Sequence, residues 1–239
     1  MPASPAALVA SLALMGVEFV FSQQLQLSRG YTPLQAGLFL LPIAVAAVLA
    51  GPLIGAVLMR AGVERMLAMM MAMTALGLGL LTVSVDAPLA WRATALAILG
   101  FGAGGAMSVA STAIMISAPE DRAGMAGSVE SVAYELGGTL GVAILGSLLA
   151  SIYTLTLAVP PDASAPALVF DSIDQALLAS EAMTPEAAAG LIGAARAAFD
   201  RGALASYVLA TAVVAALALA IGFMAGRKRN SATSVSGRA

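Results

Sequence analysis

The stretch LQAGLFLLPIAVAAVLAGPLIGAVLM, residues 34–59, contains no charged side chain. A helix that crosses a hydrocarbon core of about 30 Å needs about 20 mostly apolar residues in a row, and this stretch supplies them. Backbone inside a bilayer must satisfy its own hydrogen bonds, so a block of this length predicts a membrane-spanning helix. Pro42 and Pro52 interrupt the block without adding charge.

The rest of the chain repeats this pattern. Of its 239 residues, 60% are hydrophobic and only 10% are charged, against about 25% charged in a soluble domain. The apolar blocks are too long and too continuous for the strands of a membrane barrel. The sequence therefore predicts an all-α polytopic membrane protein, a bundle of six transmembrane helices at about 5–27, 34–59, 65–85, 91–117, 124–158 and 203–225.

Two residue types are missing from the chain. It has no cysteine and no histidine, which excludes disulfides, thiol chemistry, histidine metal ligands and Ser-His nucleophiles. With a net charge of only −2, it shows no basic patch that would favour a nucleic-acid partner. We expect a protein that is not an enzyme and that needs no cofactor or metal ion.

A polar segment separates the fifth block from the sixth. Residues 159–202 carry the carboxylates Asp162, Asp171, Asp174, Glu181, Glu186 and Asp200. FDSIDQALLASEA at 170–182 predicts one helix, and Thr184 followed by Pro185 is typical of the start of a second helix, which would run to about Asp200. We expect a helical hairpin outside the membrane, and the alternative is a polar spacer with no part in transport.

The predicted organisation has four segments. Residues 1–158 hold the first five transmembrane helices, 159–202 the extracytoplasmic hairpin loop, 203–226 the last transmembrane helix and 227–239 a basic cytoplasmic tail. Basic residues favour the cytoplasmic side of a membrane. With RKRN at 227–230 in the cytoplasm, an even number of spans places the N-terminus there too, and most of the 11 basic residues then lie inside. We expect a multi-pass protein of the bacterial inner membrane.

Three carboxylates lie inside the predicted spans, namely Glu18, Glu130 and Glu135. An ionisable side chain in a span is costly and is a functional hypothesis by default. Counted at about 1.5 Å per residue from Gly124, Glu135 lies about 16 Å deep, near the midplane, and Glu130 about 9 Å deep. Five residues turn a helix by about 140°, so these two carboxylates point in different directions and have different neighbours.

A carboxylate inside a membrane favours its protonated form, because desolvation penalises the charge. A cation that arrives beside it favours the ionised form and releases the proton, which is the minimal chemistry of a proton/cation exchanger. We therefore expect Glu135 to couple protons and Glu130 to attract a cation near the inner mouth. The alternative for each is a glutamate that is hydrogen-bonded to a neighbouring helix and does not titrate in the cycle.

The first span carries further polar residues. Ser11, Glu18, Ser22 and Gln26 fall on one helical side, at spacings of seven, four and four. Such a row either lines an aqueous cavity or forms the packing seam of a bundle, because polar side chains also join helices in membranes.

Glycines spaced four apart occur in two spans, Gly100 with Gly104 and Gly137 with Gly141. Small residues at this spacing let two helices approach closely, so both pairs predict helix contacts. The run GFGAGG at 100–105 lies inside an apolar span, without the preceding strand and βαβ unit that a dinucleotide site requires. We therefore assign these glycines to packing.

Two longer stretches resemble a known family. QLQLSRGYTPLQAGLFLLP at 24–42 is similar to the junction of the ninth and tenth helices in the fourteen-helix drug/proton antiporters of the major facilitator superfamily. APEDRAGMAGSVESVAYELGGTLGVAILGSLLASIY at 118–153 resembles their twelfth-to-thirteenth junction. GVEF at 16–19 with ESVAYELGG at 130–138 is closest to the branch that exports methyl viologen and quaternary ammonium biocides. The likeness runs over nearly the whole chain but covers only the C-terminal half of such a transporter.

The resemblance implies roles and partners. Glu130 and Glu135 match acidic positions of the thirteenth helix that the family uses for proton coupling and cation recognition, and Glu18 matches an acidic position in the ninth. The implied partners are protons, lipophilic cationic drugs or biocides, the lipid bilayer, and an N-terminal bundle or a second copy. Three interpretations stay open: the C-terminal bundle of a proton-coupled multidrug efflux antiporter, a self-associating half-transporter, and an inactive remnant of a truncated transporter gene.

One loop departs from the family pattern. GAVLMRAGVER at 55–65 resembles the superfamily loop motif G-x-x-x-D-R-x-G-R-R, with Gly55, Arg60 and Gly62 in matching positions. Met59 stands where the aspartate belongs and Glu64 stands among the basic positions, so the charge latch of this loop lacks its acidic member here. The alternative is a simple basic turn that fixes the topology.

Overall fold

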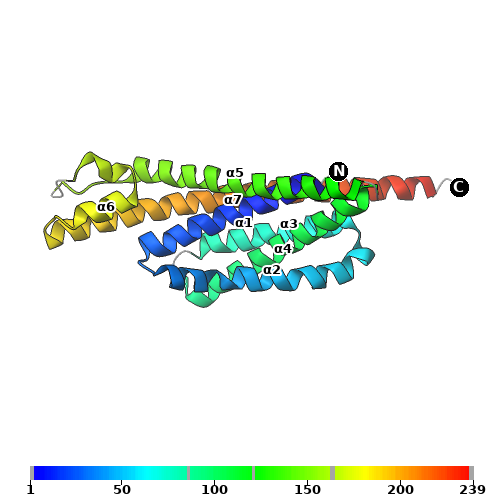
Figure 1. Cartoon of the computed structure of the whole chain (residues 1–239), viewed down its shortest axis with the longest axis horizontal. Helices are drawn as coiled ribbons and strands as arrows, with labels where there is room; N and C mark the ends of the chain where they lie inside the picture. Colours follow the sequence, from blue (N-terminus) through cyan, green and yellow to red (C-terminus); the bar gives the residue numbers. More distant parts are fainter. Residues whose placement is uncertain (1–2, 85–86, 120–121, 162–164, 237–239) are drawn as a thin grey trace.

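A computed structural model describes residues 3–84, 87–119, 122–161 and 165–236, except for the side chains of residues 3, 59–61, 89 and 228–236. This part of the chain consists of helices joined by short connections and contains no strand. Figure 1 shows an elongated bundle in which the long helices run roughly along one axis.

The first helix, α1 (Ala3–Gln23), continues directly into one π-helical turn, η1 (Gln24–Ser28). The backbone N–H of Arg29 bonds to the carbonyl of Gln24, five residues earlier, at 3.1 Å. A π turn holds one residue more than an α turn, so it changes which side chains face the bundle. Together the two elements form the first predicted span.

The second and third spans are α2 (Pro33–Ala61) and α3 (Val63–Val83). Thr32 begins α2 with a capping box: its hydroxyl accepts from the backbone of Gln35 at 3.3 Å, and the Gln35 side chain accepts from the Thr32 backbone at 2.9 Å. Pro33 occupies the first turn, where its missing N–H costs nothing. Gly62 ends α2 with φ +81°, a conformation that favours glycine.

The fourth and fifth spans are α4 (Leu89–Ser117) and α5 (Ala123–Thr156). α5 has 34 residues, which makes it about 50 Å long at the rise of an α-helix. That length exceeds a hydrocarbon core of about 30 Å, and in Figure 1 the end of α5 extends beyond α1 to α4.

The segment before the last span forms a hairpin from η3 (Ala167–Phe170), α6 (Ile173–Ser180) and the first turns of α7 (Pro185–Ser236). The sequence predicts a separate helix that ends near Asp200, but α7 runs without a break for 52 residues. No proline follows Pro185 in this helix, and single glycines such as Gly202 are tolerated within a helix. The predicted boundary at 202 and 203 therefore lies inside α7.

α1 lies near the centre of the arrangement and contacts α4, α5 and α7. α2 packs mainly on α4, and α3 lies against α4 and α7. Figure 1 shows both chain ends at one end of the bundle and the hairpin at the other. By length and composition, six of the described helices are able to cross a membrane. This confirms the predicted all-α bundle of a multi-pass membrane protein.

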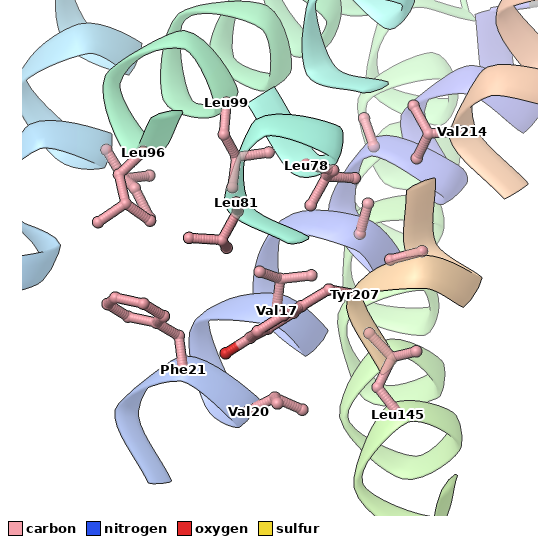
Figure 2. Close-up of a cluster of buried hydrophobic side chains, with 14 of the residues drawn as sticks. Val17, Val20, Phe21, Leu78, Leu81, Leu96, Leu99, Leu145, Tyr207 and Val214 are labelled. Atoms are coloured by element: carbon pink, nitrogen blue, oxygen red, sulfur yellow. The ribbon is translucent and has the colours of Figure 1, made fainter. Parts of the chain in front are cut away.

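The core lies where α1, α3, α4, α5 and α7 converge (Figure 2). The core side chains labelled in Figure 2 are branched aliphatic groups with one phenylalanine and one tyrosine: Val17, Val20, Phe21, Leu78, Leu81, Leu96, Leu99, Leu145, Tyr207 and Val214. In Figure 2 the hydroxyl of Tyr207 points from α7 toward the end of α1.

The glycine pair in α4 brings this helix against α2. A Cβ added to Gly100 would collide with the backbone of Ile43, and one added to Gly104 would collide with Ala47. The close contact predicted for this pair is therefore confirmed.

Candidate functional site

Two glycines determine how α5 lies on α1. A Cβ added to Gly137 would collide with the carbonyl of Leu8, and one added to Gly141 would collide with the carbonyl of Leu12. Because these positions have no side chain, the two helix backbones touch, and this face of α5 is sealed. The contact fixes the rotation of α5 about its axis and so decides where its carboxylates point.

Glu135 lies on the opposite face of α5 from Gly137, because two residues turn a helix by about 200°. Its side chain is exposed, as are those of Ser128, Ser131 and Thr139. The spacings of three, four and four residues align these four side chains along one outer face, which we call the α5 polar stripe. Within this bundle the stripe faces away from the core.

Glu130 has different surroundings. It is half-buried and interacts with the hydroxyl of Tyr134, one turn further along α5. The Tyr134 hydroxyl donates to the carbonyl of Met107 on α4 at 3.0 Å, and the Tyr134 carbonyl accepts from the hydroxyl of Ser11 on α1 at 2.7 Å. Glu130 therefore lies close to the point where α1, α4 and α5 meet.

Glu18 is half-buried on α1, the helix that packs beside α5. Of the polar row predicted with it, Ser11 belongs to the seam between α1 and α5. The side-chain amide of Gln26 donates to the hydroxyl of Ser22 at 2.9 Å, so these two polar groups satisfy each other on one helix. Among the described residues, no hydrogen bond joins Glu18, Glu130 and Glu135 to one another.

The loop motif forms the turn between α2 and α3. The N–H of Gly62 bonds to the carbonyl of Leu58 at 3.0 Å, and Gly55 lies on a part of α2 with open space around it. The side chain of Arg60 lies outside the described residues. Figure 1 places this turn at the end of the bundle that holds both termini, whereas Glu135 lies about 18 Å along α5. The structure does not bring the loop motif to the carboxylates.

A partly buried polar network, which the sequence did not predict, joins η1 to α7. The side-chain amide of Gln24 donates to Oδ1 of Asp200 at 2.8 Å, and its Oε1 accepts from the hydroxyl of Tyr207 at 2.9 Å. The Ser28 hydroxyl donates to the same Asp200 oxygen at 2.9 Å. Arg29 forms an ion pair with Oδ2 of Asp200 at 3.6 Å. We call these five side chains the Asp200 network.

Asp200 was expected at the end of a hairpin helix outside the membrane. In the structure Asp200 lies inside the continuous α7 and packs against η1. The signal in the sequence is weak: Asp200 and Arg201 stand alone between the apolar runs AAF at 197–199 and ALA at 203–205. Isolated charges inside an apolar helix mark functional or paired positions.

Arg92 packs close to this network. Its guanidinium lies over the ring of Phe21, 5.0 Å from the centroid. Its Nε is buried and has no hydrogen-bond partner among the described residues. A cation–π contact of this kind compensates part of the cost of desolvating the guanidinium.

No group of three or more acidic side chains in the described residues is arranged to hold a metal ion. The candidate site therefore consists of carboxylates, hydroxyls and amides on α1 and α5. Carboxylates are able to take up a proton or attract a cation, whereas the hydroxyls and amides donate and accept hydrogen bonds.

Comparison with known proteins gives relatives of one kind. No protein-family model matches the chain. Methyl viologen resistance protein SmvA of Salmonella typhimurium is 35% identical over 196 residues, which cover 81% of this chain and 40% of the relative. Multidrug efflux pump LfrA of Mycolicibacterium smegmatis is 32% identical over 216 residues, 88% of this chain and 42% of the relative. Multidrug resistance protein Stp of Mycobacterium tuberculosis is 34% identical over 145 residues, 61% and 27%.

These relatives agree with the six apolar helices and with the resemblance carried by residues 24–42 and 118–153. The chain spans 40% of the length of SmvA and 42% of that of LfrA, less than half of each. The chain belongs to the major facilitator superfamily, among its multidrug efflux proteins.

Proposed function

We propose that this chain is the C-terminal bundle of a proton-coupled multidrug antiporter that exports lipophilic and quaternary ammonium cations. The observation that carries the proposal is the exposure of Glu135 about 18 Å along α5. In a bundle standing alone, this side chain would face lipid, which costs at least about 2.5 kcal/mol for a charge on insertion scales. A second bundle that covers this face and encloses water removes that cost.

The α5 polar stripe supports the same arrangement. Its hydroxyls at Ser128, Ser131 and Thr139 flank Glu135 on an exposed face. The exposed side chains of α2 are in contrast largely apolar, for example Leu38, Val45 and Leu53, which suits contact with lipid. α5 also exposes apolar side chains beside the stripe, such as Val132 and Leu136, so its open face combines polar groups with apolar surface.

The chemistry follows from the positions of the carboxylates. Glu135, on the open face, exchanges a proton for a cation as the site alternates between the two sides of the membrane. Glu130 and Glu18, half-buried on neighbouring helices, add negative charge that attracts the cation. The names of the relatives, which refer to methyl viologen resistance and multidrug efflux, support this substrate class. We propose no enzymatic step.

The proposed orientation places both chain ends in the cytoplasm of a bacterial cell and the hairpin outside its inner membrane. Figure 1 supports it, because both ends lie at one end of the bundle and α7 continues into the basic stretch RKRN at 227–230. Basic residues favour the cytoplasmic side. In this arrangement the four predicted segments keep their assigned sides.

The proposal is tested by ethidium efflux from cells that express the chain together with the N-terminal bundle of a relative. Glu135→Gln is isosteric and removes the charge, so we expect it to abolish efflux driven by the proton gradient while the chain still inserts. Glu181→Gln, an exposed carboxylate on the hairpin, is the matched control and keeps wild-type efflux. Unchanged efflux in Glu135→Gln removes Glu135 from the mechanism.

A self-associating half-transporter is the second candidate, because a two-fold axis through the exposed stripe would cover Glu135 with a second copy. Purified chain in liposomes with an imposed pH gradient separates the candidates. We expect no ethidium accumulation by the chain alone, because alternating access requires two bundles around a shared site. Accumulation that Glu135→Gln abolishes favours the half-transporter, and silence both alone and with an N-terminal bundle indicates an inactive remnant.

A further inference from the structure

A cleft of about 430 Å³ lies where the hairpin meets the ends of α1, α5 and α7. Its volume falls within the range of small-molecule sites, about 300–1,000 Å³. α1 contributes Phe19 and Gln23, α5 contributes residues from 142 to 153, and the hairpin contributes residues 171–174. The cleft is therefore built partly from the segment for which the sequence left a role open.

Most of the wall is aliphatic, and the ring of Phe19 lies at its surface. Phe19 is partly exposed toward the open space, while Tyr153 and Phe199 are buried behind it. The hydroxyl of Tyr153 donates to the carbonyl of Val169 at 2.9 Å, which holds its ring in place and ties α5 to η3. An apolar wall with the Phe19 ring at its surface suits a bulky lipophilic ligand, and an exposed aromatic face attracts cations.

Two carboxylates lie at the rim. Asp171 and Asp174 line the cleft and are exposed, and Asp174 interacts electrostatically with the hydroxyl of Tyr153. Ser172 caps α6 between them, accepting from the backbone of Gln175 at 3.3 Å, so the rim backbone is held by the helix start. No basic side chain is found among the described residues that line the cleft.

We propose that this cleft binds a lipophilic cation at the hairpin end of the bundle, apart from the carboxylates of the proposed coupling site. The inference rests on the proposed function, and it gives the hairpin a part in cation handling. Charge complementarity identifies the occupant: an apolar wall with one exposed aromatic ring, Phe19, and two rim carboxylates favours an organic cation over an anion or a neutral lipid.

The cleft also continues the open face of α5. Val142 and Gly146 line it and follow Glu135 by seven and eleven residues, so they share its side of the helix. A cation that leaves Glu135 along this face reaches the cleft about 10 Å further along the axis. The cleft therefore lies where a second binding site on the path of the cation would be.

Equilibrium dialysis of radiolabelled tetraphenylphosphonium against the purified chain tests the proposal. We expect the double variant Asp171→Asn with Asp174→Asn to weaken binding about tenfold, because it removes both rim charges and keeps their shape. The matched control is Glu181→Gln with Glu186→Gln, two exposed hairpin carboxylates outside the cleft, which should bind as the wild type does. Circular dichroism confirms that both variants are folded.

Cysteine protection locates the bound cation in the same cysteine-free chain. Ser147 lines the cleft, while Ser151, one turn further along α5, is exposed but does not line it. We expect tetraphenylphosphonium to slow maleimide labelling of Ser147→Cys several-fold and to leave Ser151→Cys unaffected. Equal labelling of Ser147→Cys with and without the cation overturns the proposal.

Glu135→Gln separates this inference from the proposed function. We expect that variant to keep binding at the cleft, measured by protection of Ser147→Cys, although it loses efflux with an N-terminal bundle. If the wild type binds no tetraphenylphosphonium, or if Glu135→Gln abolishes binding while the Asp171→Asn and Asp174→Asn variant binds normally, the cleft proposal is overturned. Efflux by the assembled transporter would still support the proposed function in both cases.

Discussion

Gln24 and Asp200 are 176 positions apart in the chain, yet the side-chain amide of Gln24 donates a 2.8 Å hydrogen bond to the Asp200 carboxylate. The bond joins the π turn after α1 to α7. Tyr207, fully buried, donates to the other end of the same Gln24 amide. Leaving a buried polar group without its partner costs about 1–3 kcal/mol. The contact therefore stabilises the packing of α7 on η1 as long as Gln24, Asp200 and Tyr207 are all present.

Asp200→Ala should lower the thermal unfolding midpoint of the purified chain in detergent. The substitution removes the acceptor for Gln24 and Ser28 and the ion-pair partner of Arg29. We expect the free energy of unfolding to fall by about 1–3 kcal/mol. Asp200→Asn, which keeps the acceptor oxygen but not the charge, should lose less. The midpoint is measured by circular dichroism.

The control for this series is Glu186→Ala, which removes an exposed carboxylate from the first turn of the same helix. Its free energy of unfolding should stay within about 0.5 kcal/mol of that of the wild type, as for most surface substitutions. If Asp200→Ala unfolds at the same temperature as Glu186→Ala, the network does not stabilise the bundle.

Gly141→Ala should destabilise the contact between α1 and α5. The added methyl group meets the carbonyl of Leu12, which belongs to a helix backbone and cannot turn aside. Gly37→Ala, in open space on α2, is the matched control and should gain up to about 1 kcal/mol from helix propensity. Thermal unfolding of the two variants should therefore shift in opposite directions, and a stabilised Gly141→Ala chain would contradict the close contact.

Cysteine labelling of intact cells should report the orientation. Gln175 on α6 and Ser117 at the end of α4 are both exposed and lie at opposite ends of the bundle. A membrane-impermeant maleimide should label Gln175→Cys directly, whereas Ser117→Cys should react only after the cells are permeabilised. The reverse pattern would place the termini outside.

Glu130 and Glu135 should differ in their kinetic effects, because one is half-buried beside Tyr134 and the other is exposed. In the assembled transporter we expect Glu130→Gln to raise the KM for ethidium severalfold and to retain proton-driven efflux, because it loses cation attraction only. Glu135→Gln should abolish efflux at every ethidium concentration. Initial efflux rates over a concentration series measure both, and identical profiles would mean that the two carboxylates act as one site.

The sequence by itself determined the class of protein and its spans. Apolar blocks such as residues 34–59 are long enough to cross a bilayer, and the backbone in lipid has few alternatives to a helix. The spacing of Gly100 and Gly104 also predicted a contact, because the absence of a side chain is itself the cause of close approach. The sequence also places Glu130 and Glu135 in one span, because both lie within a single apolar block.

Only the tertiary structure decided where these groups point and what they meet. Helix periodicity gives the angle between Glu130 and Glu135, but the contact of Gly137 and Gly141 with α1 decides that Glu135 is the exposed one. The Asp200 network and the hairpin cleft join residues far apart in the chain. Such contacts depend on how whole helices pack, and that packing energy is summed over many side chains that no local pattern records.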